Sequence, residues 1–342
     1  MKALSLQSIG HLELVDLPKP RPAADQLLIR TAAATICTSD LNDIRENPFG
    51  IQLPVVMGHE AAGVVADVGK SVQGFKVDDR VATHPVHPCQ KCEQCRAGRA
   101  HLCTNMGHFG LNMQGTFAEY YLVRADRARR LADSVDLATA TLAEPVCVCL
   151  QALAQAKAAA GSNLLIIGDG PFSLIMARSA AGMGLSQVVL AGRHDFRLSR
   201  AGGATTLNLR NAPDPLSLLS SSSPAGGFDA VIATVGAIEA VQWGLELLRP
   251  KGRLVLFAAM PGQSPVDLFR VHVKELEIVG ACNDEDRFDH AVRLLADEQL
   301  KLHELITHRL PWQQYEQAFS LAANRHDAAL KVTLIWDNEA AR

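Results

Sequence analysis

The clearest hydrophobic pattern lies in the second half of the chain, where short apolar runs alternate with segments that read as helices. Two such segments, residues 171–184 and 237–248, separate runs rich in Val, Ile and Leu. Alternation of six apolar strands with helices is typical of a doubly wound parallel sheet, so we predict an α/β fold for this half. The six predicted strands are residues 163–169, 187–192, 205–209, 229–236, 252–259 and 276–283.

The first of these runs ends in Gly-Asp-Gly-Pro-Phe-Ser, residues 168–173, directly before a predicted helix. Gly168 allows a tight turn, and Gly170 lets the backbone approach a pyrophosphate at the helix N-terminus. Proline at the next position fits the first helical turn, whereas Ser173 stands where the usual motif has a third glycine. The pattern predicts a dinucleotide site. Its residues in the predicted turns are Gly168, Gly170, Pro171, Phe172, Thr234 and Val235.

A dense cysteine cluster lies in the first half, with Cys89, Cys92, Cys95 and Cys103 spaced C-x2-C-x2-C-x7-C. Short C-x2-C turns let thiolates converge on one zinc ion. The alternatives to zinc are disulfides and an iron–sulfur cluster. A bacterial iron–sulfur run would continue with x3-C-P, but here the gap is seven residues and a threonine follows. We therefore favour a closed, structural zinc site.

Composition and charge narrow the class of protein. The chain has 342 residues, 48% hydrophobic and 20% charged, which predicts a globular protein of two domains. A net charge of -3 indicates no basic surface for nucleic acid, and no apolar run is long enough to span a membrane. The start of the chain lacks the apolar core and cleavage site of a signal peptide. We expect a cytoplasmic protein, and in that reducing compartment clustered cysteines more often bind metal than form disulfides.

Four further residues carry ligand atoms, although each signal is weak alone. They are Cys37, His59, Glu60 and Glu144, from three stretches far apart in the chain. A lone cysteine is usually a small buried apolar residue, and a lone histidine is more often hydrogen-bonded in the core or at the surface. Together with the cysteine cluster and GHEAAGVVADVG at 58–69, they give the chain a resemblance to the zinc-dependent medium-chain alcohol dehydrogenases, in their sorbitol or polyol dehydrogenase branch.

The resemblance implies two zinc ions per chain. The four-cysteine cluster corresponds to the family's structural zinc lobe, whereas Cys37, His59 and Glu144 correspond to the ligands of the catalytic zinc. Glu60 would lie beside that metal and could enter or leave its coordination shell. Cysteine, histidine and carboxylate leave one position of a tetrahedral zinc open, which suits a Lewis acid that holds an alcohol.

The resemblance also assigns roles to two residues near Cys37. Ser39 corresponds to a hydroxyl that takes the alcohol proton and passes it toward solvent through the cofactor ribose. Asp40 corresponds to the group that accepts a hydrogen bond from the far ring nitrogen of His59 and so fixes its tautomer. From the residues alone, Ser39 also reads as a helix N-cap, and the two roles are compatible.

Alignment with the family places Gly192 where NAD-specific members carry an acidic residue for the ribose hydroxyls, and Arg193 follows it. A missing carboxylate removes repulsion from a 2′-phosphate, and arginine binds such a phosphate in bidentate fashion. We therefore expect NADP, with NAD as the alternative. His194 and Arg197 lie in the same turn, where Arg197 would add charge or stack on the adenine.

The family fold implies a mainly β, GroES-like catalytic domain at 1–148 and 285–342, and a Rossmann domain at 149–284. The implied function is hydride transfer between NADP(H) and a secondary alcohol or ketone, in a homodimer or homotetramer without nucleic-acid or membrane partners. The alternatives are an NAD-dependent polyol or threonine-type dehydrogenase, and a non-catalytic scaffold that binds zinc and nucleotide. Gly280 and Ala281 stand where polyol-acting relatives have an Arg-Tyr pair, which speaks against a sugar alcohol.

Overall fold

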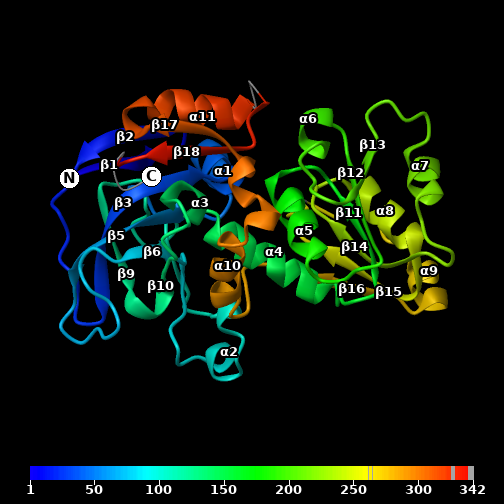
Figure 1. Ribbon diagram of the computed structural model, residues 1–342, viewed down its shortest axis with the longest axis horizontal. Coiled ribbons are helices and arrows are strands. Elements are labelled where there is room, and N and C mark those ends of the chain that lie inside the picture. The colour runs from blue at the N-terminus through cyan, green and yellow to red at the C-terminus, as the bar shows by residue number, and fades with distance from the viewer. Residues whose placement is uncertain (261, 264, 325–327, 338–342) are drawn as a thin grey trace. The chain divides into compact units, whose positions relative to one another are not determined.

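The structure of the chain is a computed structural model (Figure 1). It describes residues 1–260, 262–263, 265–324 and 328–337. The chain divides into two compact units, of which the first is discontinuous. The first unit comprises Met1–Glu144 and Phe288–Arg342, and the second comprises Pro145–Arg287.

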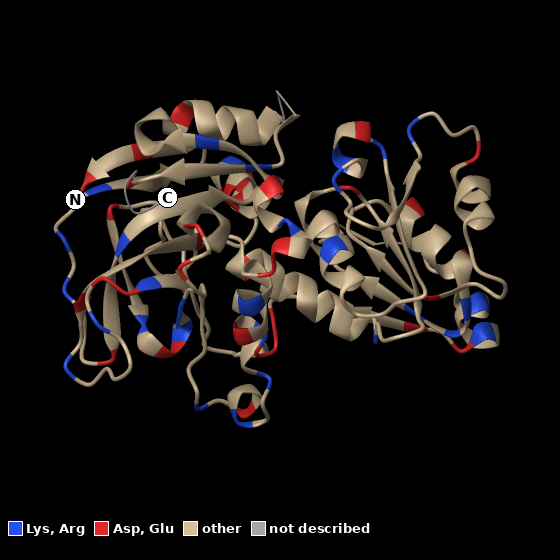
Figure 2. Ribbon diagram, viewed as in Figure 1, with Lys and Arg blue, Asp and Glu red and all other residues tan. Residues whose placement is uncertain are grey.

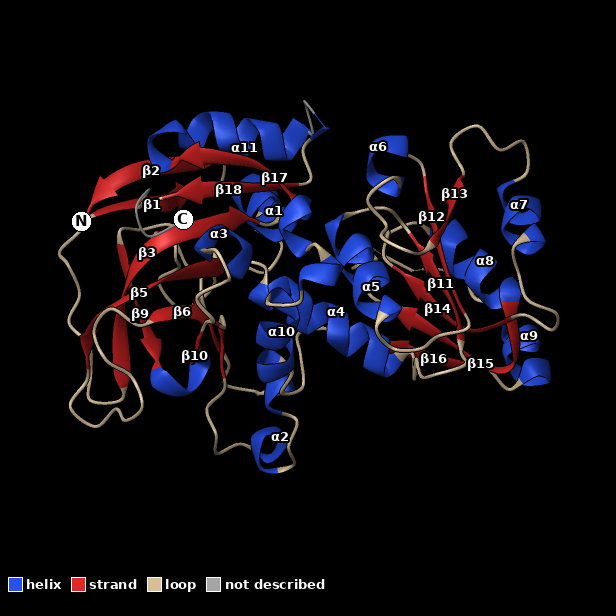
Figure 3. Ribbon diagram, in the orientation of Figure 1, coloured by secondary structure: helices blue, strands red, loops and turns tan. Residues whose placement is uncertain are grey.

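The second unit is a parallel sheet with helices along both faces (Figure 3). Its strands are β11 (Asn163–Ile167), β12 (Gln187–Gly192), β13 (Thr205–Asn208), β14 (Phe228–Ala233), β15 (Leu248–Leu256) and β16 (Glu277–Gly280). Its helices are α4 (Ala143–Gln155), which crosses the unit boundary in the chain, α5 (Pro171–Ala181), α6 (Asp195–Leu198), α7 (Pro215–Ser221), α8 (Ile238–Leu247) and α9 (Leu268–Lys274). Each predicted apolar run overlaps one strand, which confirms the doubly wound α/β prediction.

The strand order of this sheet is β13-β12-β11-β14-β15-β16, so the direction of winding reverses between β11 and β14. Doubly wound sheets bind ligands at the carboxyl ends of their strands, at such a reversal. Gly168 follows β11 and Thr234 follows β14. Both turns predicted to bind the cofactor therefore lie at the reversal point.

The first unit is mainly β-structure (Figure 3). Its strands are β1 (Lys2–Ser8), β2 (His11–Asp16), β3 (Gln26–Ile36), β4 (Val55–Val56), β5 (Glu60–Val68), β6 (Arg80–Thr83), β7 (Val86–His87), β8 (Gly107–His108), β9 (Tyr120–Arg124), β10 (Ala128–Arg130), β17 (Ile306–Pro311) and β18 (Lys331–Ile335). Its α-helices are α1 (Thr38–Glu46), α2 (Glu93–Arg96), α3 (Leu137–Ala140), α10 (Phe288–Leu295) and α11 (Tyr315–Asn324). Short 3-10 turns lie at η1 (Ala100–Leu102), η2 (Ala125–Arg127), η3 (Glu298–Leu300), η4 (Leu302–Leu305) and η5 (Trp312–Gln314).

Strand β3 is the centre of the larger sheet in this unit. It pairs with β5 along one edge, and with β9 and then β18 along the other. Its residues are almost all buried, and Leu27 and Ile29 pack in the same core as Phe117 and Tyr121. The core therefore fixes the strand whose carboxyl end leads to Cys37.

Charged residues of both signs are interspersed in the two units (Figure 2). The net charge of -3 is thus spread along the chain rather than gathered in one segment. Within the described ranges, no helix has both the length and the apolar character needed to cross a membrane.

Candidate metal and cofactor sites

Cys37 and His59 meet because strands β3 and β5 are antiparallel neighbours. Cys37 follows the last residue of β3, and His59 precedes the first residue of β5. The ladder pairs Thr35 with Glu60, so the flanking residues lie at one end of the sheet. The ligand atoms of Cys37, His59 and Glu60 lie within 4.8 Å of one another. The fold therefore gathers three of the predicted residues into one buried cluster.

Asp40 and Ser39 stand beside this cluster in the first turn of α1. Asp40 Oδ1 lies 3.1 Å from His59 Nδ1, and Asp40 Oδ2 accepts a hydrogen bond of 2.8 Å from the Cys37 backbone N–H. Because Nδ1 faces Asp40, the other ring nitrogen, Nε2, remains for a different partner, and Ser39 Oγ lies 3.5 Å from it. Asp40 is 1% exposed, so its contact with the ring is shielded from water.

The electrostatic environment of the cluster favours a cation. Burial lowers the pKa of His59, but the Asp40 carboxylate and the Cys37 sulfur together raise it well above its usual value. Surroundings that stabilise an imidazolium also stabilise a metal cation, since both are attracted by the same anions. Sulfur, imidazole nitrogen and carboxylate oxygen are the donors that zinc prefers. The residues present therefore fit a zinc ion.

Lys331 belongs to this site, although the sequence reasoning missed it. It is the first residue of β18, whose Val332 pairs with Ile36 of β3, so the lysine lies beside Cys37. Its Nζ lies 2.5 and 2.6 Å from the two carboxylate oxygens of Glu60. Burial lowers the pKa of Lys331, but the charges of Glu60 and Cys37 raise it above its usual value. Lys331 therefore stays protonated and holds Glu60 in a buried ion pair.

Glu144 occupies the first turn of α4, near the same charges. Among the described residues, the group whose ligand atoms lie within 4.8 Å contains Glu60 and not Glu144. The charge of Glu144 nevertheless contributes to the raised pKa of Lys331. The first unit thus provides two carboxylates for this region, one of which is paired with Lys331.

His108 is a second residue near the cluster without an assigned role from the sequence. Its ring centroid lies 5.7 Å from that of His59. Burial, followed by the nearby charge of His59, lowers the pKa of His108 to about 3. Its Nδ1 donates to the Phe109 carbonyl over 2.7 Å, so the ring is neutral and fixed.

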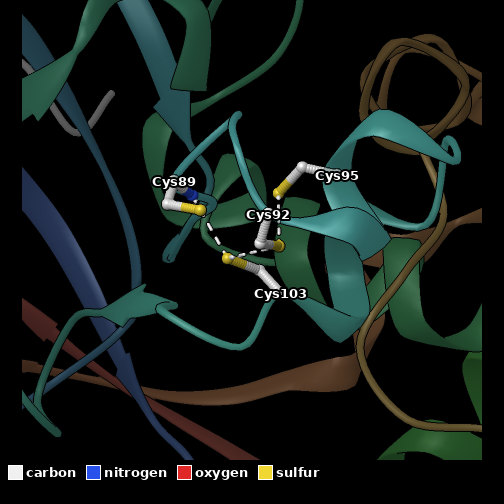
Figure 4. Close-up of side chains that lie close together, drawn as sticks. All are labelled: Cys89, Cys92, Cys95 and Cys103. Atoms are coloured by element: carbon white, nitrogen blue, oxygen red, sulfur yellow. Dashed lines mark hydrogen bonds between the residues drawn. The ribbon is translucent and has the colours of Figure 1, made fainter.

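The four-cysteine cluster brings its thiols together in a lobe around α2 (Figure 4). Cys92 Sγ lies 3.5 Å from Cys95 Sγ and 3.8 Å from Cys103 Sγ. Four sulfurs at about 2.3 Å from one tetrahedral zinc are separated by about 3.8 Å, whereas a disulfide requires about 2.05 Å. All four ligand atoms lie within 4.8 Å of one another, and Cys89 completes the set. The spacing fits a metal site and does not fit disulfides.

Hydrogen bonds to sulfur stabilise a thiolate in this lobe, and clustered thiolates favour a bound cation. The backbone N–H groups at Cys95 and Thr104 lower the pKa of Cys92 to about 5. Desolvation and the neighbouring thiols raise the pKa of Cys95 to about 12. Four thiolates this close repel one another unless a metal ion lies among them, and metal binding would release their protons.

The turn after β11 is tight and open toward the helix N-terminus. Gly168 has a φ of 127°, and a Cβ there would lie 2.1 Å from Thr234 Oγ1. Gly170 caps α5 with Pro171 in the first turn, and a Cβ at 170 would meet no atom within 4 Å. Ser173, in place of the third glycine, forms a hydroxyl hydrogen bond of 2.7 Å with Thr234. Open space at the N-terminus of a helix fits a phosphate.

Two further predicted residues flank this turn with apolar atoms. A Cβ at Gly168 would lie 2.8 Å from Val235 Cγ1, so the valine lies directly over the glycine. The Phe172 ring lies 5.4 Å from the Phe257 ring, measured between centroids. Both residues therefore shape the walls of the turn.

Asp169 organises the turn after β12, a role that the sequence reasoning missed. Its Oδ2 accepts hydrogen bonds from the backbone N–H groups of Arg193 and His194, at 2.7 and 2.8 Å. The same oxygen lies 2.9 Å from His194 Nδ1, and Oδ1 lies 3.5 Å from Arg197 Nη1. Arg197 is buried against Asp169, whereas the Arg193 side chain is exposed.

Comparisons with known proteins find dehydrogenase family models that match residues in both units. The family model described as "Alcohol dehydrogenase GroES-like domain" matches residues 23–133, and the one described as "Zinc-binding dehydrogenase" matches residues 171–297. The L-threonine 3-dehydrogenase of Shewanella baltica (strain OS185) is 30% identical, over 98% of this chain and 100% of its own length.

Solved structures of similar proteins share the fold. A zinc-binding dehydrogenase from Sinorhizobium meliloti 1021, bound to NADP, superposes with a TM-score of 0.91 at 27% identity and covers 98% of both chains. An alcohol dehydrogenase from E. coli CFT073, complexed with NADH, has a TM-score of 0.91 at 26% identity, over 98% of this chain and 99% of its own. Both solved structures are similar to this chain along nearly its whole length.

Replacing Lys331 tests the buried ion pair. Removing one partner of such a pair leaves an uncompensated charge and typically costs about 3–5 kcal/mol. We expect Lys331→Met to lower the free energy of unfolding, measured by urea titration, by about that amount, and Lys331→Arg to lower it less. The double variant Glu60→Gln/Lys331→Met removes both charges and should regain most of the loss.

Lys157→Met is the matched control for this measurement. Lys157 pairs with Glu277 at 3.2 Å, but its side chain is 66% exposed. Exposed pairs contribute about 0–1 kcal/mol, so this variant should unfold nearly as the parent does. Equal stability of Lys331→Met and Lys157→Met would contradict the importance of the buried pair.

Proposed function

Because the chain belongs to the zinc-dependent medium-chain alcohol dehydrogenase family, we propose that it transfers a hydride between NADP(H) and a secondary alcohol or the corresponding ketone. Family membership makes it an oxidoreductase that acts on alcohols. The observation that carries the finer proposal is the convergence of Cys37 and His59 in a buried cluster, beside the Glu60 carboxylate that Lys331 holds. A scaffold that only bound zinc and nucleotide would have no use for this cluster beside the cysteine lobe.

Cys37, His59 and Glu144 would hold the catalytic zinc. Glu60 is already paired with Lys331, which leaves Glu144 as the carboxylate for the third position. Three protein ligands on a tetrahedral ion keep the fourth position for substrate. A zinc bound there supplies a Lewis acid that polarises the substrate oxygen.

Asp40 and Ser39 would orient the ring and move the proton. Asp40 accepts a hydrogen bond from His59 Nδ1 and thereby fixes the tautomer that presents Nε2. Ser39 Oγ, 3.5 Å from that nitrogen, would accept the proton of the substrate hydroxyl and pass it toward solvent. Glu60, held by Lys331, would stand beside the site as one half of a neutral ion pair.

A second zinc would occupy the cysteine lobe. Cys89, Cys92, Cys95 and Cys103 supply four sulfurs, the full set for a tetrahedral ion. No position would remain for a substrate, so this ion would clamp the loop rather than take part in the reaction. We therefore propose two zinc ions per chain with different functions.

NADP is the cofactor that we propose. Gly192 itself carries no carboxylate, and the nearby Asp169 carboxylate is occupied by donors of its own turn. The exposed Arg193 follows Gly192 and can bind a 2′-phosphate. The NADP-bound structure from Sinorhizobium meliloti 1021 supports this choice, and the NADH complex from E. coli CFT073 keeps NAD as the alternative.

An NAD-dependent, threonine-type dehydrogenase is the second candidate. The Shewanella baltica relative, 30% identical, is an L-threonine 3-dehydrogenase. The candidates separate in one assay, because a threonine dehydrogenase would oxidise L-threonine, itself a secondary alcohol, with NAD. The leading proposal expects NADP and other secondary alcohols. Gly280 and Ala281 at the end of β16 do not supply the polar pair expected for a polyol.

Two features of organisation complete the proposal. We assign residues 1–148 and 285–342 to the zinc-binding catalytic domain, and 149–284 to the cofactor domain. A homodimer or homotetramer is supported by the apolar surface at the edge strand β16 and on α9. The exposed apolar side chains there are Leu268, Phe269, Val273 and Ile278, at 74%, 77%, 61% and 36% exposure.

Metal analysis tests the catalytic site. Wild-type protein should carry two zinc ions per chain, and Cys37→Ala should carry one, with alcohol oxidation lost and the circular dichroism spectrum unchanged. Cys92→Ser is the counterpart, which should lose the other ion and lower the Tm. Turnover that survives in Cys37→Ala would argue against a catalytic zinc at this position.

Cofactor binding, followed by nicotinamide fluorescence, tests the preference for NADP. Wild type should bind NADPH more tightly than NADH. Arg193→Ala should raise the Kd for NADPH by about tenfold or more, because a hydrogen bond to a charged group contributes about 1.5–3 kcal/mol. The Kd for NADH should stay unchanged, as should both values in Arg210→Ala, another exposed arginine of this unit. Tighter binding of NADH by wild type would overturn the assignment.

Light scattering after size exclusion tests the oligomer. Phe269→Asp combined with Leu268→Asp places two charges on the apolar face of α9 and should reduce the measured mass of the particle. Ile9→Asp is the control, since Ile9 is 57% exposed in the first unit and should leave the mass unchanged. A monomeric wild type would refute the proposed assembly.

A further inference from the structure

We infer that Asp169 is a positioning residue that determines which adenosine cofactor the second unit binds. It holds the turn after β12 so that Arg193 is presented to a 2′-phosphate, and it bars an acidic side chain from position 192. The inference rests on the proposed use of NADP and explains it. Asp169 also lies in the Gly-x-Gly turn, at the position to which the motif assigns no role.

The Asp169 carboxylate accepts hydrogen bonds from residues of its own unit. Three donors converge on Oδ2, and Oδ1 faces Arg197. An ionised carboxylate offers about four acceptor positions, so these partners occupy them. Burial raises the pKa of Asp169, but the N–H groups of Arg193 and His194 lower it below its usual value, and the group stays ionised. Oδ2 therefore has no acceptor position left for the ribose hydroxyls of NAD, and Oδ1 faces Arg197.

Packing excludes the alternative carboxylate. A Cβ at Gly192 would lie 2.4 Å from Asp169 Cβ and 2.6 Å from its Oδ2. Contacts this short require a shift, and Asp169 is 6% exposed and fixed by several hydrogen bonds. A second carboxylate would also repel the first. The acidic residue that binds ribose in NAD-specific folds is thus incompatible with Asp169.

The basic side chains of this turn fall into two groups, those that face Asp169 and the exposed Arg193. Arg197 faces Asp169, which offsets its charge, and the His194 ring contacts the same carboxylate. Arg193 is exposed, and within the described part of the chain no carboxylate forms an ion pair with its guanidinium. Because Asp169 fixes the Arg193 backbone, the outward guanidinium starts from a defined position. An exposed arginine whose backbone is fixed at the carboxyl end of β12 suits bidentate binding of a phosphate monoester.

Binding of NADPH and NADH to the full-length protein tests this role. Asp169→Ala removes the hydrogen bonds to the turn and should raise the Kd for NADPH about tenfold, with little change for NADH. The preference ratio would therefore fall, whereas a merely structural role would weaken both cofactors equally. Asp169→Asn keeps the volume and should lower the ratio less. Asp195→Ala, an exposed acid of the same turn, is the control and should leave the ratio unchanged.

Two further variants test the steric exclusion of a side chain at position 192. Gly192→Asp alone should bind both cofactors poorly, because it collides with Asp169. Asp169→Gly/Gly192→Asp removes the blocking Cβ and should bind NADH more tightly than NADPH. These variants decide the question if Asp169→Ala does not fold by circular dichroism.

Two outcomes would overturn the inference, and they differ in what else they affect. Tighter binding of NADH by wild type would refute the proposed use of NADP and this inference with it. A wild type that prefers NADPH, with a ratio unmoved in Asp169→Ala and Asp169→Asn, would refute the role of Asp169 alone. Good NADPH binding by Gly192→Asp would refute the steric exclusion.

Discussion

The antiparallel ladder on strand β3 is the constraint on which the buried cluster around Cys37 depends. Glu60 of β5 pairs with Thr35, and Val332 of β18 pairs with Ile36. That register delivers a sulfur, an imidazole, a carboxylate and an ammonium group to one end of the sheet. A slip of one residue would turn each strand's side chains to the opposite face, so strand pairing and site chemistry cannot be separated.

Two buried acids in different units follow the same physics. Glu60 meets the ammonium group of Lys331, and Asp169 meets backbone N–H groups and the side chains of His194 and Arg197. Burying a carboxylate is costly unless donors replace the lost water, and here they do. Each acid is therefore held in one position, which ligand recognition requires of the residues that support a site.

The sequence predicted most of the second unit because buried parallel strands are continuous apolar runs, as Leu-Leu-Ile-Ile in β11 illustrates. Cys37 and His59 were recognised only through resemblance, because nothing local shows that two strands bring them together. Lys331 escaped notice because a lysine before an apolar strand reads as a surface residue, and its partner lies 271 positions away. Asp169 escaped because its role depends on a turn that packs against it.

The discontinuity of the first unit has a consequence for the order of events in the cell. A ribosome makes the second unit, Pro145–Arg287, before it reaches β17 and β18. The second unit is contiguous in the chain, and domains generally fold as units during translation. It can therefore fold before Lys331, the counter-ion of Glu60, has been synthesised. The arrangement proposed to hold zinc is therefore completed only after the C-terminal strands have joined a sheet begun at the other end of the polypeptide.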